Sequence, residues 1–415
     1  MTVALPYDPV FPHRDALLDS DVVASCLASR LDWANDITLC ERVRATYRVG
    51  DSLRVLHRFH ARGETYNVAA RGFHPGRSGR AFEKALGNTP GGDARGVVHR
   101  PDVDAVFWLF PHDRRVPALQ KLETARTALS ECLPRPWVHS RLVAWAPENS
   151  ATFQCLAADG AVLAYAKVGA CARIEYERYR ALEAALAGTG SPLLVPRAIA
   201  IASDGDTMLI ETASGRRLAY APADMRAMGI ALAHLHAASL PDLLRFERFT
   251  PSSLQESVAL ITRAVPQLQP ALEALGARLT RHHPADEALG SLHGDVHPKN
   301  VVVDGARLAL IDVEEMAWGA RAADLGSLLS RVICGRMVND FTPTAMGLAS
   351  EAFLDGYASV SALPDDDTLT WHTAAALMVE RAQRAVTRLN EPVLRRLDAL
   401  IAEASRLLNS TAGVR

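Results

Sequence analysis

Asp295, Asn300 and Asp312 supply the oxygen groups that phosphoryl transfer from a nucleotide requires. Such a reaction needs a carboxylate near the attacking hydroxyl and hard oxygen ligands for Mg²⁺, because position and charge stabilise its transition state. The first two residues belong to the segment HGDVHPKN at 293–300, and Asp312 follows twelve residues after Asn300. This segment is therefore the first candidate for a catalytic loop.

The chain between Asn300 and Asp312 predicts how these two residues meet. Residues 301–303 and 308–311 form two apolar runs around an Asp-Gly pair, a pattern typical of a hairpin. A four-residue loop would set Asn300 opposite Ile311, so that Asp312 lies beside Asn300. The alternative is a polar loop followed by a surface hairpin, in which this spacing is accidental.

The catalytic loop is also suggested by a second spacing. Asp295 precedes Asn300 by five residues, as the catalytic aspartate precedes the metal-binding asparagine in protein kinases. His293 and His297 lie in the same segment, and a zinc site is an alternative use for two histidines four residues apart. Such a zinc-binding pair needs a helix, whereas this loop contains Gly and Pro. We therefore expect the two histidines to brace the loop.

A nucleotide kinase also needs a lysine on a strand, paired with a helical glutamate, to orient the α- and β-phosphates. Lys167 lies in an otherwise apolar run, AYAKV at 164–168, where a buried ammonium group requires a partner. In the helix that follows, Glu175 shares a face with apolar residues at i+4, i+7 and i+11, so we expect it to pair with Lys167. Glu177 is the second choice of partner. The alternative is an edge-strand lysine with a solvated glutamate.

Composition indicates an ordinary globular protein of two or three structural units, since single cores rarely grow to 415 residues. Lys and Arg total 45 against 47 Asp and Glu, so no strong net charge attracts nucleic acid or an anionic membrane. The sequence has neither a transmembrane stretch nor a signal-peptide run, so we expect a cytoplasmic protein. Its six scattered cysteines, without CxxC spacing, indicate reduced packing residues.

The order of expected elements is a β-rich half followed by a helix-rich half, which predicts an α+β bilobal fold. The Gly- and Arg-rich stretch 76–96 is expected to be a loop or a mobile insertion. In the first half we expect helices at 15–33 and 174–186 and strands at 42–49, 53–61, 65–70, 105–110, 141–146, 152–156, 161–168, 195–202 and 207–212. In the second half we expect helices at 224–238, 253–262, 271–281, 325–333, 345–358 and, in two segments, 369–408, interrupted only by 300–313.

The segment HGDVHPKN, with IDVEEMAWGARAADLG after it, resembles the aminoglycoside phosphotransferase and choline kinase-like superfamily. The resemblance spans roughly residues 140–400 and implies a protein-kinase-like fold with a β-rich N-lobe and a helical C-lobe, which uses ATP and Mg²⁺. It also implies that Asp295 is the catalytic aspartate, that Asn300 and Asp312 bind Mg²⁺, and that Asp324 holds the loop.

The same resemblance locates the nucleotide between the lobes. It implies a hinge strand at 208–215, where Glu211 and Ala213 meet adenine. A plain buried strand that ends in a turn is the alternative. The phosphate-covering loop of the family falls at 146–152, which contains no glycine and one acid, so a flexible cradle of backbone amides is not evident.

The first 135 residues have no counterpart in the shorter aminoglycoside kinases and resemble the cap of maltokinase-like actinobacterial sugar kinases. We therefore expect an N-terminal, β-containing cap at 1–135, an N-lobe at 136–215 and a C-lobe at 216–415. Residues 107–115 mix aromatic and basic groups. We expect them to form an amphipathic packing edge, and the alternative is a contact with substrate or with the N-lobe.

The expected activity is ATP-dependent phosphorylation of a hydroxyl on a small molecule such as a sugar, an aminoglycoside or another antibiotic. A peptide Ser or Thr in natural-product maturation is an alternative acceptor. An acidic groove for aminoglycosides would need clustered late carboxylates, and the run at 365–367 stands alone and suits a solvated turn or a helix start. The alternative from another class is a nucleotide-binding pseudokinase or scaffold, which the glycine-free loop favours.

Overall fold

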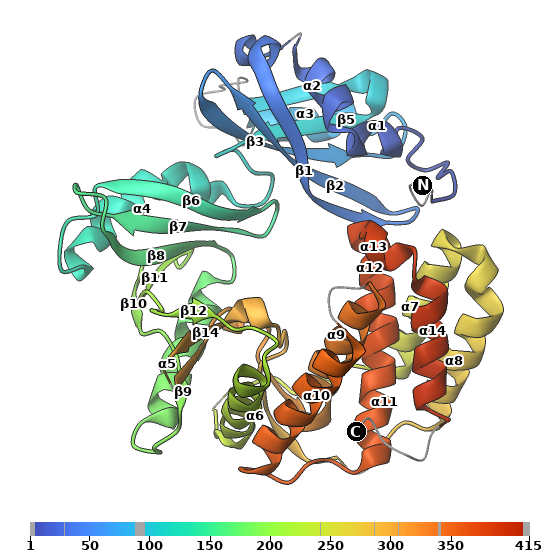
Figure 1. Cartoon of the computed structure of the whole chain (residues 1–415). Helices are drawn as coiled ribbons and strands as arrows, with labels where there is room; N and C mark the ends of the chain where they lie inside the picture. Colours follow the sequence, from blue (N-terminus) through green and yellow to red (C-terminus); the bar gives the residue numbers. More distant parts are fainter. Residues whose placement is uncertain are drawn as a thin grey trace.

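The computed structural model describes residues 5–28, 30–87, 96–240, 242–285, 287–305, 307–338 and 342–409. A first five-stranded sheet is followed along the chain by a second five-stranded sheet and then by a largely helical part (Figure 1). We call these parts the N-terminal region (5–138), the N-lobe (139–215) and the C-lobe (216–409). The fold class is thus α+β, as the sequence predicts.

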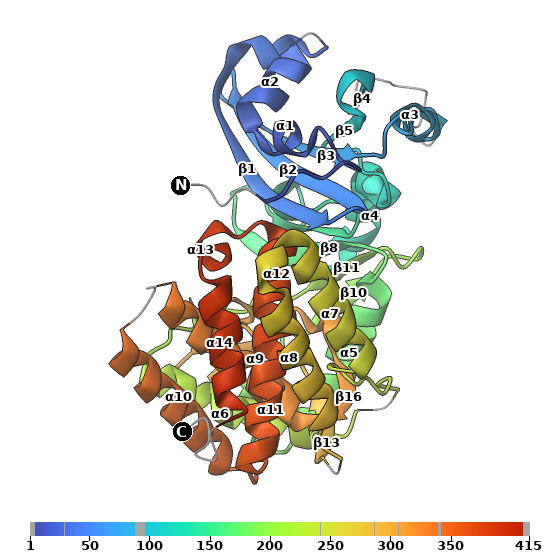
Figure 2. The same cartoon turned by 90° about the vertical axis from the view of Figure 1, so that its right-hand side faces the viewer.

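The N-terminal region is built on an antiparallel sheet. Its elements are α1 (Arg14–Leu18), α2 (Ser20–Ala28), β1 (Ile37–Arg48), β2 (Ser52–Ala61), β3 (Glu64–Gly72), α3 (Ser78–Gly87), β4 (Val97–Arg100), β5 (Ala105–Leu109) and α4 (Leu122–Leu129). The strand order is β1-β2-β3-β5-β4, and α1 and α2 lie over one face of the sheet (Figures 1 and 2). Apolar side chains of both helices, such as Leu17 and Leu27, pack there against Leu53 and Phe59 of β2.

Two predictions for this region are wrong. The helix expected at 15–33 is divided, because Asp19 is extended and its carboxylate accepts the backbone N–H groups of Asp21 and Val22 at the start of α2. The stretch 76–96, expected to be a loop, contains helix α3. Its residues 88–95 lie outside the described part of the chain.

The N-lobe holds the second sheet, of strand order β10-β11-β8-β7-β6. Helix α5 follows β8 directly, which brings the helix to the end of the strand that carries Lys167. The elements are β6 (His139–Ala146), β7 (Ser150–Leu156), β8 (Val162–Gly169), α5 (Ala172–Leu186), β9 (Leu193–Leu194), β10 (Ala198–Ile201) and β11 (Thr207–Ile210).

The C-lobe combines helices with two small sheets. Its first elements are β12 (Arg216–Arg217), α6 (Pro222–Ala237), α7 (Pro251–Ala264), α8 (Gln269–Arg281), β13 (Leu289–Leu292), β14 (Val301–Asp304), β15 (Arg307–Leu310), β16 (Ala317–Ala320), α9 (Arg321–Met337) and α10 (Pro343–Ala358). One sheet has the order β12-β14-β15-β9, and the other pairs β13 with β16. The prediction that 300–313 alone interrupts the helices is therefore wrong, since β13 and β16 are too short for a periodic signal.

The C-terminal helices are more divided than the two expected segments. They are α11 (Asp366–Ala376), the π-helix η10 (Leu377–Ala382), α12 (Gln383–Arg388), α13 (Glu391–Leu394) and α14 (Leu397–Leu407). α12 ends where Leu389 adopts a left-handed conformation with φ of 52°. At the other end, Asp365 caps α11 by accepting the N–H of Thr368, which is the helix start that the run at 365–367 suggests.

The N-terminal region contacts both lobes. Apolar residues of its sheet, including Val106 and Trp108, share one core with Trp145 and Phe153 of the N-lobe. On the side of the C-lobe, β1 packs against α12, as Figures 1 and 2 show. The region therefore bridges the two lobes.

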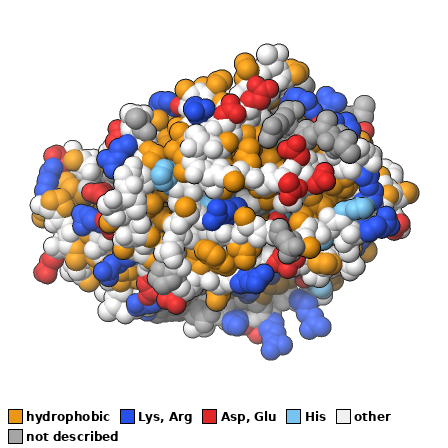
Figure 3. Space-filling model, turned by 90° about the horizontal axis from the view of Figure 1, so that it is seen from below, with side chains coloured by type: hydrophobic (Ala, Val, Ile, Leu, Met, Phe, Trp, Pro, Cys, Tyr) orange, Lys and Arg blue, Asp and Glu red, His pale blue; other side chains and the backbone are white. Residues whose placement is uncertain are grey.

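The surface of the C-lobe carries mixed charge. Seen from below, acidic and basic side chains are interspersed on this face, as expected from nearly equal totals of the two kinds (Figure 3). Among the described residues, none of the helices has the length and apolarity needed to cross a membrane.

Candidate active site

The catalytic loop begins where β13 ends. Gly294 has a φ of +86°, and a Cβ atom there would lie 2.2 Å from the carbonyl oxygen of Glu315. Only glycine fits this turn without strain. The neighbouring N–H groups of His293 and Gly294 donate to the carboxylate of Asp324 in the first turn of α9, at 2.7 and 3.2 Å. The loop is therefore held in place through its backbone N–H groups, which bind the carboxylate of Asp324.

Asp324 is a structural anchor, in the position that the resemblance implies. It is fully buried and also contacts His236 and Arg248, at 3.4 and 3.3 Å. Burial alone would raise the pKa of Asp324, but the hydrogen bond from His236 and the charge of Arg248 outweigh it and lower the pKa to about 2. The carboxylate stays ionised and keeps accepting the loop amides.

The two histidines of the loop brace it, as expected. His293 accepts the N–H of Asp295 at Nδ1 (3.3 Å) and donates from Nε2 to the carbonyl oxygen of Ile311 (3.2 Å). His297 accepts the N–H of Lys299 at Nδ1, 3.1 Å away. His297 thus bonds within the loop, and His293 also ties the loop to the residue before Asp312. In the described part of the chain no group of three or more His, Cys, Asp or Glu is arranged to hold a metal.

Asp295 and Asn300 face each other across the loop. The side-chain amide of Asn300 donates to the carbonyl oxygen of Asp295 at 3.1 Å and to its carboxylate at 3.3 Å. The backbone of Asn300 accepts the N–H of Ile311 at 2.9 Å, next to the hairpin of β14 and β15. The predicted hairpin is thus present, and it sets Asp312 beside Asn300.

Asp295 lies among positive charges. Arg331 of α9 and Arg384 of α12 each approach its Oδ1 atom to 3.7 Å. Burial would raise the pKa of Asp295, but Arg384, Lys299 and Arg331 outweigh it and hold the pKa below its usual range. Asp295 is therefore an ionised carboxylate at neutral pH. Sequence reasoning missed both arginines, because they are distant in the chain.

Asp312 meets Lys167 from the opposite lobe. It follows β15 in a left-handed conformation with φ of 65°, and its N–H donates to the hydroxyl of buried Tyr179 on α5, at 2.9 Å. Lys167 Nζ lies 3.1 Å from Asp312 and 2.5 Å from Glu175. The expected ion pair of Lys167 with Glu175 is present, and Glu177 is exposed to solvent.

A third carboxylate, Glu314, also contacts Lys167 Nζ at 3.0 Å. Sequence reasoning missed it, although the acidic pair that follows Asp312 by two residues is a visible signal. Burial would lower the pKa of Lys167, but Glu175, Asp312 and Glu314 raise it, so the lysine stays protonated. Burial raises the pKa of Glu175 to about 7, against the attraction of Lys167. The ammonium group of Lys167 thus forms ion pairs with three carboxylates.

Glu211 and Ala213 lie apart from this cluster. They follow β11 in the link that leads to β12, between the N-lobe sheet and the C-lobe sheet. The N–H of Glu211 donates to the carbonyl oxygen of Arg197 at 2.9 Å, and its side chain is exposed. Within the described ranges, no hydrogen bond joins either residue to Lys167 or Asp312. Their role at adenine stays a prediction.

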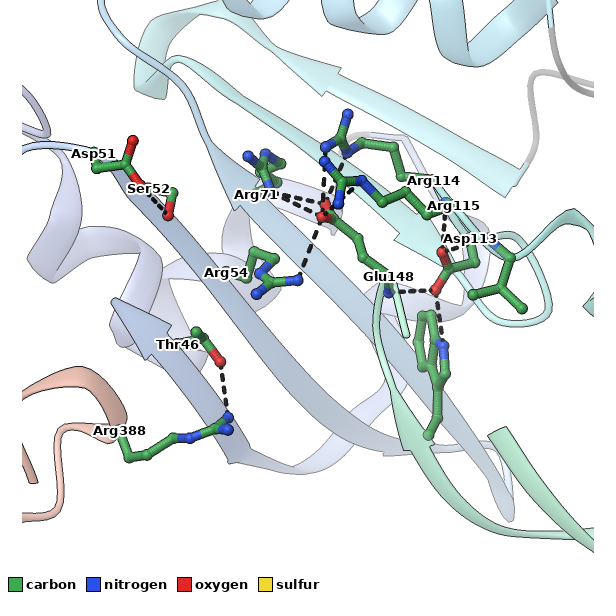
Figure 4. Close-up of polar contacts among 12 residues, drawn as sticks. Thr46, Asp51, Ser52, Arg54, Arg71, Asp113, Arg114, Arg115, Glu148 and Arg388 are labelled. Atoms are coloured by element: carbon green, nitrogen blue, oxygen red, sulfur yellow. Dashed lines mark hydrogen bonds and ion pairs between the residues drawn. The ribbon is translucent and has the colours of Figure 1, made fainter. Parts of the chain in front are cut away.

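The loop between β6 and β7 is the one that the sequence resemblance predicts to cover the phosphates, and this role stays a prediction. Its acid, Glu148, has a φ of 66° and is nearly buried. The carboxylate of Glu148 is surrounded by arginines of the N-terminal region: Arg71 at 2.9 Å, Arg114 at 2.8 Å, Arg54 at 3.4 Å and Arg115 at 3.7 Å (Figure 4). These arginines lower the pKa of Glu148 although burial would raise it.

The neighbouring Asp113 strengthens this attachment. Its Oδ2 atom accepts the N–H of Glu148 at 2.9 Å and the indole N–H of Trp145 at 3.0 Å. Residues 107–115 therefore serve both as a packing edge, through the buried Trp108, and as the contact with the N-lobe that was the alternative. The loop is tied to the N-terminal region by its carboxylate.

The donors present fit Mg²⁺. Asp312 and Glu314 offer partly exposed carboxylate oxygens, and Asn300 offers an amide oxygen, which are the hard ligands that Mg²⁺ prefers. Mg²⁺ sites of this kind use one or two protein ligands and complete the shell with phosphates and water, so a full protein cage is not needed.

The two lobes, with Lys167 and Glu175 in one and the catalytic loop in the other, define a protein-kinase-like fold. Two solved structures share it. A candidate aminoglycoside phosphotransferase of Ralstonia eutropha JMP134 has a TM-score of 0.51 and 16% identity, with 69% of this chain and 98% of that chain covered. Amicoumacin kinase hAmiN, solved with AMP-PNP, Ca²⁺ and amicoumacin, has a TM-score of 0.51 and 14% identity, with 71% and 94% covered.

The sequence itself also matches a known family model over part of the chain. Residues 165–363 match the model of the phosphotransferase enzyme family APH, a range that contains Lys167, Glu175 and the whole catalytic loop. This part of the chain, 165–363, is therefore similar to that family. A comparison with curated proteins finds no match. The N-terminal region, β6 and β7 lie outside the matched range.

Proposed function

We propose that this protein is an ATP-dependent phosphotransferase that phosphorylates a hydroxyl group of a small molecule. The observation that carries the proposal is the convergence of Lys167 with Glu175 from the N-lobe and Asp312 from the C-lobe, within 3.1 Å of one ammonium nitrogen. The match of residues 165–363 to the phosphotransferase family model supports it, and so does the structural likeness to a kinase solved with AMP-PNP.

Each charged residue would have one task in this reaction. Lys167, oriented by Glu175, would bind the α- and β-phosphates of ATP, and Glu211 and Ala213 would offer backbone groups to adenine. Asp295 would align the acceptor hydroxyl and take its proton, which its lowered pKa allows over the neutral range. Asn300 and Asp312 would hold Mg²⁺, which supplies positive charge against the phosphates when bound.

We also propose that the chain is divided into a cap at 1–135, an N-lobe at 136–215 and a C-lobe at 216–415. The proposed location is the cytoplasm, where ATP is available. The acceptor hydroxyl could belong to a sugar, an aminoglycoside or another antibiotic.

The test is ADP release by the full-length protein with ATP, Mg²⁺ and a panel of sugars, aminoglycosides and nucleoside antibiotics. We expect turnover on at least one compound and its loss in Asp295→Asn, while a thermal shift with ATP and Mg²⁺ persists in that variant. Absence of both turnover and nucleotide binding would contradict the proposal. Asp304→Asn, in the turn of the neighbouring hairpin, is a matched control that should retain activity.

A nucleotide-binding pseudokinase or scaffold is the second candidate. The attachment of the glycine-free loop to the N-terminal region through Glu148 favours it, because a tied loop is poorly suited to close over phosphates. This candidate predicts binding of ATP without turnover on any alcohol, peptide Ser or peptide Thr. The presence of Asp295, Asn300, Asp312 and Lys167 together favours the enzyme.

A further inference from the structure

Arginines from two helices, α9 and α12, flank the candidate catalytic base Asp295. Arg331 and Arg384 each lie 3.7 Å from Asp295, so two guanidinium groups share one carboxylate. Arg384 is half exposed, and Arg388 follows it by one helical turn on α12. The side chains of residues four apart in a helix lie on one face. Arg384 and Arg388 thus form a basic edge that begins at Asp295.

The N-terminal region adds two more arginines to this edge. Arg388 donates to the hydroxyl of Thr46 in β1 at 3.0 Å, as Figure 4 shows. Thr46 is directly opposite Arg54 in the β1–β2 register, and Arg44 lies two residues before Thr46. Side chains at these positions share one face of a sheet. Arg44 and Arg54 therefore face the same side as the end of α12.

The carboxylates nearby do not balance this charge. Glu148 is shared among Arg54 and three other arginines, and Glu314 is bound to Lys167. Among the described residues, neither Arg44 nor Arg388 has a carboxylate within ion-pair distance, and Arg384 has only the Asp295 that it shares.

Mutual repulsion contributes to the lowered pKa values of Arg388 and Arg44. Burial and the charges of Arg44, Arg384 and Arg54 lower the pKa of Arg388 to about 10. Burial and Arg54 likewise lower the pKa of Arg44. Uncompensated like charges destabilise a fold, and an anion bound among them relieves that cost.

We propose that the acceptor carries an anionic group, a phosphate or a carboxylate, which Arg44, Arg384 and Arg388 bind while its hydroxyl meets Asp295. This inference rests on the proposed function. In the reaction, the hydroxyl oxygen bonds to the γ-phosphorus of ATP, the bond from that phosphorus to the β–γ bridging oxygen breaks, the proton passes to Asp295, and ADP leaves. Guanidinium groups pair with phosphate and carboxylate through two parallel hydrogen bonds. A cationic acceptor would meet repulsion at the same edge.

The first test compares acceptors of one carbon frame that differ in charge: glucose, glucose 6-phosphate, glucuronate and glucosamine, and glycerol with glycerol 3-phosphate and glycerate. We expect ADP release with at least one anionic member, at a kcat/KM about tenfold or more above its neutral partner. Turnover that favours the neutral or amino members would overturn the inference and leave the proposed function standing.

The second test uses Arg384→Gln, Arg388→Gln and the double variant. Each single change should raise the KM for the anionic acceptor about tenfold, as loss of a charge-assisted hydrogen bond does, while the KM for ATP changes less than about twofold. Arg388→Lys should recover part of the loss. A rise in the KM for ATP alone would assign the arginines to the nucleotide and overturn the inference.

Two controls complete the design. Arg406→Gln removes an exposed arginine whose one ion-pair partner among the described residues is Glu403, and it should alter neither KM. Calorimetric titration of glycerol 3-phosphate and of glucose 6-phosphate into the wild type and the double variant gives a readout without catalysis. Binding to the wild type alone, with no ADP release on any compound, would support the anion site and contradict the phosphotransferase. Equal binding to both proteins would overturn the anion site.

Discussion

At the scale of residues, the site divides into two groups of opposite surroundings. Lys167 is one cation among Glu175, Asp312 and Glu314, whereas Asp295 is one anion between Arg331 and Arg384. The first arrangement suits an ammonium group that binds phosphate oxygens, which compete with the three carboxylates for it. The second keeps a base ionised while it offers cations to a partner of the opposite sign.

Lys167→Met tests the first group. The change removes the ammonium that we propose to orient the phosphates, so kcat/KM for ATP should fall about 100-fold or more, as after loss of one preorganised charge. Glu175→Gln should show a smaller loss in the same direction. Glu177→Gln, on the exposed side of α5, is the matched control and should behave like the wild type in the same ADP-release assay. Equal losses in both glutamine variants would contradict the assignment of Glu175.

His57 makes stability depend on pH. It is fully buried in β2, donates to the carbonyl oxygen of Leu17 and accepts from Ser20, and burial lowers its pKa from 6.5 to about 4. Between pH 6.5 and about 4, His57 is protonated in the unfolded chain but stays neutral in the folded chain. The contribution of His57 to the free energy of unfolding is therefore complete above pH 6.5 and is lost as the pH falls toward 4.

The loss should reach about 3 kcal/mol at the acid end of this window. Urea unfolding of wild type and His57→Gln at pH 7.5, 6, 5 and 4 measures it as the difference between the two proteins. A difference that does not change with pH would show that His57 does not titrate in this way.

At the scale of elements, local patterns determine the catalytic hairpin. Asn300 and Asp312 flank two strands with a tight turn, so spacing alone predicted their meeting. The division of 369–408 by the π-helix and by left-handed Leu389 could not be read in this way, because both features depend on packing against distant helices. The break at Asp19 and helix α3 were missed because Asp, Gly and Arg also suit loops.

Gly294 offers a test of the catalytic loop as an element. Gly294→Ala should destabilise the protein by at least about 3 kcal/mol, because its Cβ would meet the carbonyl oxygen of Glu315 at 2.2 Å as well as adopt a strained φ. Gly160→Ala is the matched control: its φ of +83° is nearly the same, but no atom lies within 4 Å of a Cβ there. It should cost about 1 kcal/mol, measured by urea unfolding. If the two variants lose similar free energies of unfolding, the cost comes from the positive φ alone and not from the contact with Glu315.

At the scale of the whole molecule, the N-terminal region joins the two lobes. It shares a core with the N-lobe, holds the β6–β7 loop through Glu148, and reaches the C-lobe through Thr46 and Arg388. The sequence did not reveal these contacts, because Glu148 and Arg71 are far apart in the chain and their spacing carries no periodic signal. The joined lobes suggest that the motion between them is restricted.

Glu148→Gln tests this attachment. Four arginines would lose their shared carboxylate, so stability should fall by about 2 kcal/mol, a value reduced from that of a fully buried pair because the arginines are partly exposed. The KM for ATP should change at the same time if the freed loop covers the phosphates, as the resemblance predicts. Glu403→Gln, whose partners Arg336 and Arg406 are more exposed, should cost less than about 1 kcal/mol. Unchanged stability in Glu148→Gln would contradict the attachment.

The π-helix η10 sets the rotational phase of the helix that follows it. α11 is buried against α9, and the chain runs without a break from Asp366 through the wide turn at 377–382 to Arg388. If these six residues were wound as ordinary α-helix, the downstream segment would be turned by about 100° relative to α11, which is one residue of helical rotation. Arg384 would then lose its contact with Asp295, and Arg388 would lose its hydrogen bond to Thr46 of β1. The angular offset of one wide turn therefore decides whether the basic edge faces Asp295, the proposed catalytic base, or the solvent.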